Sequence, residues 1–375
     1  ASNLPAVYNN LGLAYSAVGN FRKANSSFKI ALKVSPTYRT AIINFAKFLQ
    51  KIKKYKEVIS MLEGYLERKE DLEMREILAR VYFSMGQYGK TEMILKRIID
   101  NPFKLILSSQ EYGRLYNNLG VIYHKKGNLL EAGKAYYMSE EQGGYNSPII
   151  ISNLIDLNFD KKNLEQAEKY IGILHKNFKE EKSYYYQMGR SRLYRGDLQD
   201  AIKFLLLSIE KHDNFLPAYP LLSCMYSERL EDYKSAIKLN EYGAKIFPKS
   251  EGIINNLAYN YLMVGDIAKA KTILNKIPDN ECTLHLYATK GLLAIKEGDI
   301  KEGSRLYNLA SKMAETLFGK DLRGQVLQKK NLELGKYYLS VGNKNEAKDH
   351  FSKAVTFNAK EKYYLEQAQA LLKSL

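Results

Sequence analysis

The sequence has few of the residues that interrupt a folded chain. Its 375 residues include only 8 prolines, and no stretch rich in proline, glycine or serine separates one part from another. We therefore expect no linker between domains. A transmembrane helix needs roughly 18 consecutive apolar residues or more. No run of that length occurs, so no such helix is expected.

Residue patterns typical of catalysis and metal binding are also missing. Among the five histidines, only His285 lies three to five residues from a cysteine or another histidine, since it follows Cys282 by three. No second such pair accompanies it, so the full spacing of a zinc site is absent. The chain has no phosphate-binding glycine loop, no G-x-S-x-G turn and no H-E-x-x-H helix. The sequence therefore predicts no catalytic residue, no metal and no cofactor, and we expect that this chain is not an enzyme.

What the sequence does contain is an internal repeat. Residues 8–12 read YNNLG, residues 116–120 have the same five letters, and residues 254–258 read INNLA. A stretch that recurs inside a longer spaced pattern indicates a repeat protein. The positions equivalent to Gly12 are Gly12, Ala46, Ala79, Gly120, Ile155, Gly189, Ser223, Ala258, Gly291 and Gly335. They lie 33 to 35 residues apart except at two places, where the spacing is 41 and 44 residues.

A second recurring position, occupied mostly by small residues, follows each Gly12 equivalent by twelve residues. In one repeat the spacing is thirteen residues. The residues of this second marker are Ala24, Val58, Thr91, Ala132, Ala167, Ala201, Ala236 (after thirteen), Ala270, Gly303 and Ala347. Small side chains allow two helices to cross closely, because a larger side chain would overpack the crossing. The spaced pattern resembles the tetratricopeptide repeat, a helix–turn–helix unit of about 34 residues.

This resemblance implies an all-α fold, a right-handed superhelical α-solenoid. We expect ten units over residues 5–360 as one continuous body, followed by a capping helix over residues 361–375. No corresponding cap precedes Leu4, so we expect the N-terminal side to continue in a longer protein. Cys224 and Cys282 lie about two repeats apart, which is too far for a disulfide.

Turn signals separate the two helices of most units. Glycine followed by asparagine or aspartate occurs at residues 19–20, 127–128, 196–197, 265–266, 298–299 and 342–343. Glycine adopts the left-handed conformation that ends a helix, and Asn or Asp can cap the next helix. The turns at residues 53–54, 162–163 and 231–232 lack the glycine. The extra residues of the two long spacings fall within 103–112 and 313–330, and we interpret both as lengthened helices.

Candidate binding residues follow from the resemblance, which implies that the first helix of each unit lines a concave groove. The residue two places before each Gly12 equivalent faces this groove in the family. In this chain it is often an amide, which offers a donor and an acceptor to the backbone of an extended peptide. We therefore predict a partner-binding groove formed by Asn10, Asn44, Arg80, Asn118, Asn153, Gln187, Arg190 and Asn256.

The net charge of +16 raises the possibility of nucleic-acid binding. A nucleic-acid binder concentrates its basic residues on one face. The groove positions carry basic and acidic residues in about the same proportion as the rest of the chain, so we consider nucleic acid the second alternative.

The sequence therefore predicts a scaffold or adaptor that binds a protein or peptide partner in its concave groove. A usage rich in lysine, asparagine, isoleucine and tyrosine is typical of A/T-rich genomes, and it leads to the hypothesis of a bacterial envelope or secretion assembly. The first alternative is a regulatory or substrate-binding part of an enzyme whose catalytic part lies outside this chain.

Overall fold

The computed structural model describes residues 4–100, 107–143, 147–178, 180–278, 282–318, 320–357 and 363–375. Over these residues every regular element is helical, which confirms the all-α class. The chain divides into two compact units, Ala1–Glu181 and Lys182–Leu375. The prediction of one continuous body over residues 5–360 stays a prediction. None of the described helices has the length and apolar content needed to cross a membrane.

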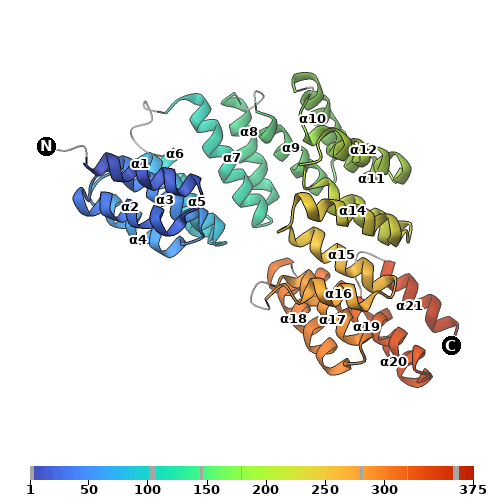
Figure 1. Cartoon of the computed structure of the whole chain (residues 1–375). Helices are drawn as coiled ribbons and strands as arrows, with labels where there is room; N and C mark the ends of the chain where they lie inside the picture. The colour runs from blue at the N-terminus through green and yellow to red at the C-terminus, as the bar shows by residue number, and fades with distance from the viewer. Residues whose placement is uncertain are drawn as a thin grey trace. The chain divides into compact units, whose positions relative to one another are not determined.

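The first unit contains the helices α1 (Leu4–Ala17), α2 (Phe21–Val34), α3 (Arg39–Lys51), α4 (Tyr55–Leu66), α5 (Leu72–Ser84), α6 (Tyr88–Ile99), α7 (Ser109–Lys125), α8 (Leu129–Glu141), α9 (Pro148–Asp160) and α10 (Leu164–Asn177). Each odd-numbered helix packs against the even-numbered helix that follows it (Figure 1). Successive odd-numbered helices also touch, as α1 does with α3 and α7 with α9.

The second unit contains α11 (Ser183–Tyr194), α12 (Leu198–Lys211), α13 (Ala218–Cys224), a π-helical turn η3 (Met225–Arg229), α14 (Tyr233–Ile246), α15 (Glu251–Met263), α16 (Ile267–Leu274), α17 (Leu284–Lys296), α18 (Ile300–Phe318), α19 (Lys320–Ser340), α20 (Lys344–Thr356) and α21 (Tyr363–Lys373). Its helices are paired in the same way, and α21 packs against both α20 and α19.

Small residues at the two marker positions lie where paired helices cross. Ala24, Ala132 and Ala347 have no exposed surface. A Cβ atom added at Gly120 would lie 2.5 Å from the ring of Tyr136, and one added at Gly335 would be equally crowded by Phe351. The repeat therefore places a large side chain of the second helix directly over a glycine of the first, which confirms the close crossing expected from the sequence.

The π-helical turn η3 explains the one irregularity of the second marker. Ala236 follows Ser223 by thirteen residues instead of twelve, and it is fully buried like its equivalents. A π-helical turn accommodates one additional residue within a helix. Because η3 lies between these two positions, it absorbs the additional residue and Ala236 still reaches the helix crossing.

The turns between paired helices have the conformation expected from the sequence. Gly19, Gly86, Gly127, Gly196, Gly265, Gly298 and Gly342 all have positive φ. Lys53, Lys162 and Glu231 take the same left-handed conformation without glycine, with φ of 58°, 58° and 52°. Where the residue after the turn is Asn or Asp, its side chain caps the next helix, as the Asn163 side chain accepts a hydrogen bond from the backbone N–H of Gln166. Lys54 and Gln87 form no such bond.

The left-handed lysine at residue 162 leads to a stability prediction. A left-handed non-glycine residue costs about 1–2 kcal/mol, and glycine loses about 0.5–1 kcal/mol more backbone entropy on folding than alanine. Lys162→Gly should therefore stabilise the first unit by roughly 0.5–1 kcal/mol, measured by urea denaturation. Gly127→Ala is the reverse change at an equivalent turn and should destabilise. A loss of stability in Lys162→Gly contradicts this account.

The two long spacings correspond to longer helices. The second one is explained by α18 and α19, of 19 and 21 residues against 12 to 14 in most others, which confirms the interpretation of residues 313–330. In the first, α7 has 17 residues and begins at Ser109 after a capping box between Ser108 and Glu111, while residues 103–106 lie outside the described residues. Residues 363–373 form the expected terminal helix, whose Ala368 is fully buried, and residues 361–362 are outside the described part. Cys224 and Cys282 are both free thiols.

Candidate binding sites

The residues predicted to face a groove differ in exposure. Asn10 and Asn118 are exposed, whereas Asn44 and Asn153 are half-buried. Gln187 is only 2% exposed, and its Oε1 accepts a hydrogen bond from Arg190 at 3.0 Å. Asn10 and Asn118 are therefore accessible to a ligand, whereas Gln187 is not, and partner binding by these residues stays a prediction.

The half-buried amides, and the buried Thr289 at the equivalent position, form hydrogen bonds between neighbouring repeats. Each contacts the first residue of the asparagine pair in the preceding first helix. The contacts are Asn44 Nδ2 to Asn9 Oδ1 at 3.0 Å, Asn153 Nδ2 to Asn117 Oδ1 at 2.8 Å, and Thr289 Oγ1 to Asn255 Oδ1 at 2.8 Å. Because Asn9 and Asn117 are buried, these bonds also satisfy polar groups that have little access to water.

The two asparagines of a pair therefore have different environments. In the pair Asn117–Asn118, the first side chain holds α7 to α9, and the second is exposed on the surface of α7. The sequence pattern identified the pair, but not which member is engaged. A helix rotates by about 100° per residue, so adjacent side chains point in different directions.

A cleft in the first unit brings Asn118 together with Arg80. It lies among α5, α6 and α7 and has a volume of about 170 Å³. Its floor is apolar and includes Phe83, Leu95 and Val121. We call it the α5–α7 cleft.

The rim of the α5–α7 cleft is polar. Arg80 and Asn118 are exposed there, and within the described residues neither side chain has a hydrogen-bond or ion-pair partner. Arg114 donates to Glu76 Oε1 at 2.8 Å across the rim. The cleft therefore suits a ligand whose apolar side chain contacts the floor and whose polar main-chain or acidic groups contact the rim. Sequence reasoning missed the apolar floor, because its residues belong to three helices and follow no single spacing.

In the second unit, the predicted residues do not share one site. Arg190 lies over the ring of Tyr186, 5.7 Å from its centre, beside Gln187. Asn256 lines a different cavity, described below, where its Nδ2 donates to the carbonyl oxygen of Pro220 at 3.4 Å.

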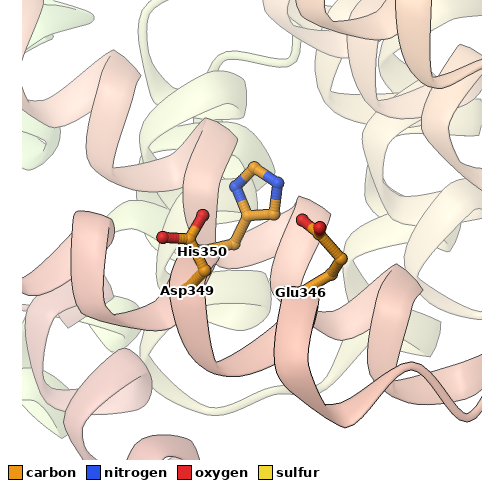
Figure 2. Close-up of side chains that lie close together, drawn as sticks. All are labelled: Glu346, Asp349 and His350. Atoms are coloured by element: carbon orange, nitrogen blue, oxygen red, sulfur yellow. The ribbon is translucent and has the colours of Figure 1, made fainter.

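One cluster of potential metal ligands occurs on α20, formed by Glu346, Asp349 and His350 (Figure 2). One ligand atom from each lies within 4.8 Å of the others. The search for His and Cys spacing missed this mixed cluster, although positions i, i+3 and i+4 share one helix face.

The contacts of this cluster are already made within the chain. Asp349 accepts a hydrogen bond from the ammonium of Lys353, and His350 Nδ1 lies 3.1 Å from Asn331 Oδ1. The ring of His350 stacks on Tyr338 at 5.4 Å. Burial lowers the pKa of His350, and the charge of Lys353 lowers it further. We assign no metal to this cluster because a lysine already balances one carboxylate.

Comparisons with known proteins support the repeat. A family model described as "Tetratricopeptide repeat" matches residues 5–38, 113–137 and 331–361. No curated protein matches the chain.

Solved structures with similar folds include a monomeric mutant of IFIT1 with Gppp-AAAA. It is 16% identical, the match covers 93% of this chain and 90% of that chain, and the TM-score is 0.54. Yeast Tom70 is 15% identical with coverage of 99% and 88% and a TM-score of 0.48. A tetratricopeptide repeat protein from Parabacteroides merdae ATCC 43184 is 17% identical with coverage of 74% and 98% and a TM-score of 0.45.

The likeness to IFIT1 concerns the fold alone. The first two matched stretches contain the pentapeptide copies at residues 8–12 and 116–120. The helices are paired throughout both units. The chain therefore contains tetratricopeptide repeats in the three matched stretches.

Proposed function

We propose that this chain is an interaction scaffold whose first unit binds an extended segment of a partner protein in the α5–α7 cleft. The observation that carries the proposal is an apolar cleft with two exposed polar side chains at its rim, Arg80 and Asn118, whose hydrogen-bonding capacity is unused within the described residues. Tetratricopeptide repeats serve as protein-interaction scaffolds in general, which supports this class of function.

The floor of the cleft selects an apolar side chain. Phe83 and Val121 are half-buried, so part of their apolar surface is open to a ligand, while Leu95 closes the bottom. Covering apolar surface contributes roughly 25 cal/mol per Å². A volume of about 170 Å³ accommodates one large side chain rather than a folded element.

The rim adds recognition of polar groups. The Asn118 amide offers a donor and an acceptor, which match the N–H and C=O of an extended backbone. Arg80 offers a planar fork of donors that fits a carboxylate. Because Arg114 is paired with Glu76, Arg80 is the unpaired charge of the rim. The preferred segment therefore has an acidic residue beside a large apolar one.

The test is selection of displayed random peptides on the full chain, followed by affinity measurements. Selected peptides should share a large apolar residue next to Asp or Glu. Asn118→Ala removes up to two neutral hydrogen bonds and should weaken binding roughly two-fold to a hundred-fold. Arg80→Ala removes a charge-assisted contact and should weaken binding roughly ten-fold to a hundred-fold.

Asn153→Ala is the matched control. Its amide holds α9 to α7, so this change should lower thermal stability and leave the affinity for a selected peptide nearly unchanged. Unchanged affinity in both Asn118→Ala and Arg80→Ala contradicts the proposal. Displacement of the peptide by single-stranded RNA, with binding that falls steeply with salt, indicates a nucleic-acid binder instead.

The remaining alternative is a binding part of an enzyme whose catalytic part lies outside this chain. The cleft then selects a segment of the substrate rather than of an assembly partner. The full-length reading frame distinguishes these roles, because only the second requires catalytic sequence on the same polypeptide.

A further inference from the structure

A second cavity, of about 300 Å³, lies entirely within the second unit. Its walls come from α13, η3, α15, α17, α18, α19 and α21. Four of these elements, η3, α18, α19 and α21, depart from the regular repeat. The lengthened α19 contributes Leu322, Val326 and Lys329, and the terminal helix α21 contributes Tyr363 and Tyr364. The additional residues of the tenth repeat therefore build one side of a cavity.

Lys329 is the central charged group of this cavity. Its Nζ atom lies 4.2 Å from the ring centre of Tyr259 and 5.2 Å from that of Tyr364. These distances correspond to cation–π contacts, which hold an ammonium without an acceptor atom. Within the described residues, Lys329 forms no hydrogen bond and no ion pair, so its three N–H donors have no protein acceptor.

Lys329 keeps its charge in this position. Burial acts to lower its pKa, but interactions with Tyr259, Tyr307 and the carboxylates of Glu228 and Glu333 raise it by more. The pKa of Lys329 therefore lies above the ordinary lysine value. The ammonium is charged at neutral pH and has a strong requirement for acceptors.

A second donor without a partner lines the same cavity. Tyr307 is fully buried, and its hydroxyl has no hydrogen-bond partner within the described part of the chain. Leaving a buried hydroxyl unpaired costs free energy, and such a group in a native fold calls for a ligand or a water. Lys329 and Tyr307 together present donors to a space that lacks a matching acceptor.

The other charged groups of the wall limit the charge of the ligand. The π-helical turn η3 places Glu228 and Arg229 side by side, and π-helical turns occur frequently at functional sites. Desolvation lowers the pKa of His285 and outweighs the opposing carboxylate of Glu251, while the charge of Lys329 also lowers it, so this imidazole is mostly neutral at pH 7. Lys329, Arg229 and Glu228 then sum to one positive charge. This balance suits a single negative charge, whereas a dianion would be repelled by Glu228.

The shape of the cavity indicates the rest of the ligand. Tyrosine rings and the apolar side chains of Leu284, Ala288 and Val326 contribute flat apolar surface, and polar groups contribute about as much of the lining. The volume lies at the lower end of the range for small-molecule sites. We propose that the second unit binds a small organic monocarboxylate with a planar body, whose carboxylate accepts hydrogen bonds from Lys329 and Tyr307. This site is separate from the α5–α7 cleft and does not depend on the function proposed for that cleft.

The experiment is isothermal titration of the full chain with benzoate and with 4-hydroxybenzoate as probes. Saturable binding is expected for at least one of them. Lys329→Met should weaken it roughly ten-fold to a hundred-fold, because a charge-assisted contact is lost. Tyr307→Phe removes only the hydroxyl and should weaken binding roughly two-fold to ten-fold.

Lys330→Met is the matched control for charge and helix position. Lys330 Nζ donates to Asn308 Oδ1 at 3.0 Å, so the side chain is engaged with α18. This variant should bind both probes as the original chain does. Circular dichroism checks that Lys329→Met remains folded. If it does not, Tyr307→Phe is the deciding variant.

Three results overturn the proposal. The first is no saturable binding of either probe, and the second is equal binding in Lys329→Met or, where that variant is unfolded, in Tyr307→Phe. The third is equally tight binding of inorganic phosphate, which indicates a general anion site. A further probe is a terminally blocked peptide with one glutamate. If this peptide binds in a way that depends on Lys329 while benzoate does not bind, the cavity belongs to a partner protein, and the small-molecule proposal is also overturned.

Discussion

Tyr136→Ala is expected to lower the free energy of unfolding of the first unit by about 3–5 kcal/mol, as for other large aromatic side chains removed from a core. Tyr136 is 1% exposed and lies over Gly120 at the crossing of α7 and α8. Removing the ring leaves a cavity next to a glycine, which has no side chain that could move in to fill it. The loss therefore combines the transfer free energy of the ring with the full cost of the cavity.

Native-state hydrogen exchange is the appropriate measurement, because repeat arrays do not always unfold in a single cooperative step. Protection should fall most in α7 and α8. Tyr137→Ala is the matched control, since Tyr137 is the next residue of the same helix and is 41% exposed. It should change the stability by about 0.5 kcal/mol or less. Similar losses in the two variants would show that the ring at residue 136 does not support the crossing.

Gly120→Leu should have the second largest effect, a loss of roughly 1–3 kcal/mol or more. A Cβ atom at this position would lie 2.5 Å from Cδ1 and Cε1 of Tyr136, which is closer than real contacts allow. The ring is fully buried and cannot move without displacing its own neighbours. The helices α7 and α8 would have to separate, and the damage should remain local because each repeat contacts mainly its neighbours.

The control for Gly120→Leu is Gly172→Leu in α10. Gly172 is also a helical glycine, but it is exposed, and an added Cβ atom meets nothing within 4 Å. Leucine has the higher helix propensity, so this change should be neutral or stabilise by up to about 1 kcal/mol. Opposite signs in the two variants, measured by hydrogen exchange of α7 and α10, would show that crowding decides the outcome. A loss of equal size at residue 172 would instead indicate a general intolerance of leucine at these glycines.

Much of the fold could be predicted from the sequence because the repeat is a local pattern. The small residues at Gly120 and Ala132 and the large one at Tyr136 recur at fixed distances within one helix pair. Such a pair is determined by residues close together along the chain. The left-handed turns are equally local, since Gly127 and Asn128 end one helix and cap the next.

The roles of the binding residues could be predicted less well, because these roles depend on the neighbouring repeat. Asn117 and Asn118 are adjacent and identical in type. Only the position of Asn153, 36 residues further on, makes one of them a buried acceptor and leaves the other on the surface. Similarly, Arg80 was predicted from its position in one helix, while the apolar floor beside it also requires side chains from two more helices.

The sequence by itself determined the class of fold, the number and length of the repeats, the turns between their helices and the positions of the longer helices. These features depend on hydrogen bonds and side-chain contacts between residues near one another in the chain. Only the tertiary structure decided which polar side chains are engaged and where a cavity remains. In the sequence, Lys329 is one lysine among many. Its environment is made by Tyr259, Tyr307 and Tyr364, residues from three other helices, and contacts of that range are decided by how whole helices pack.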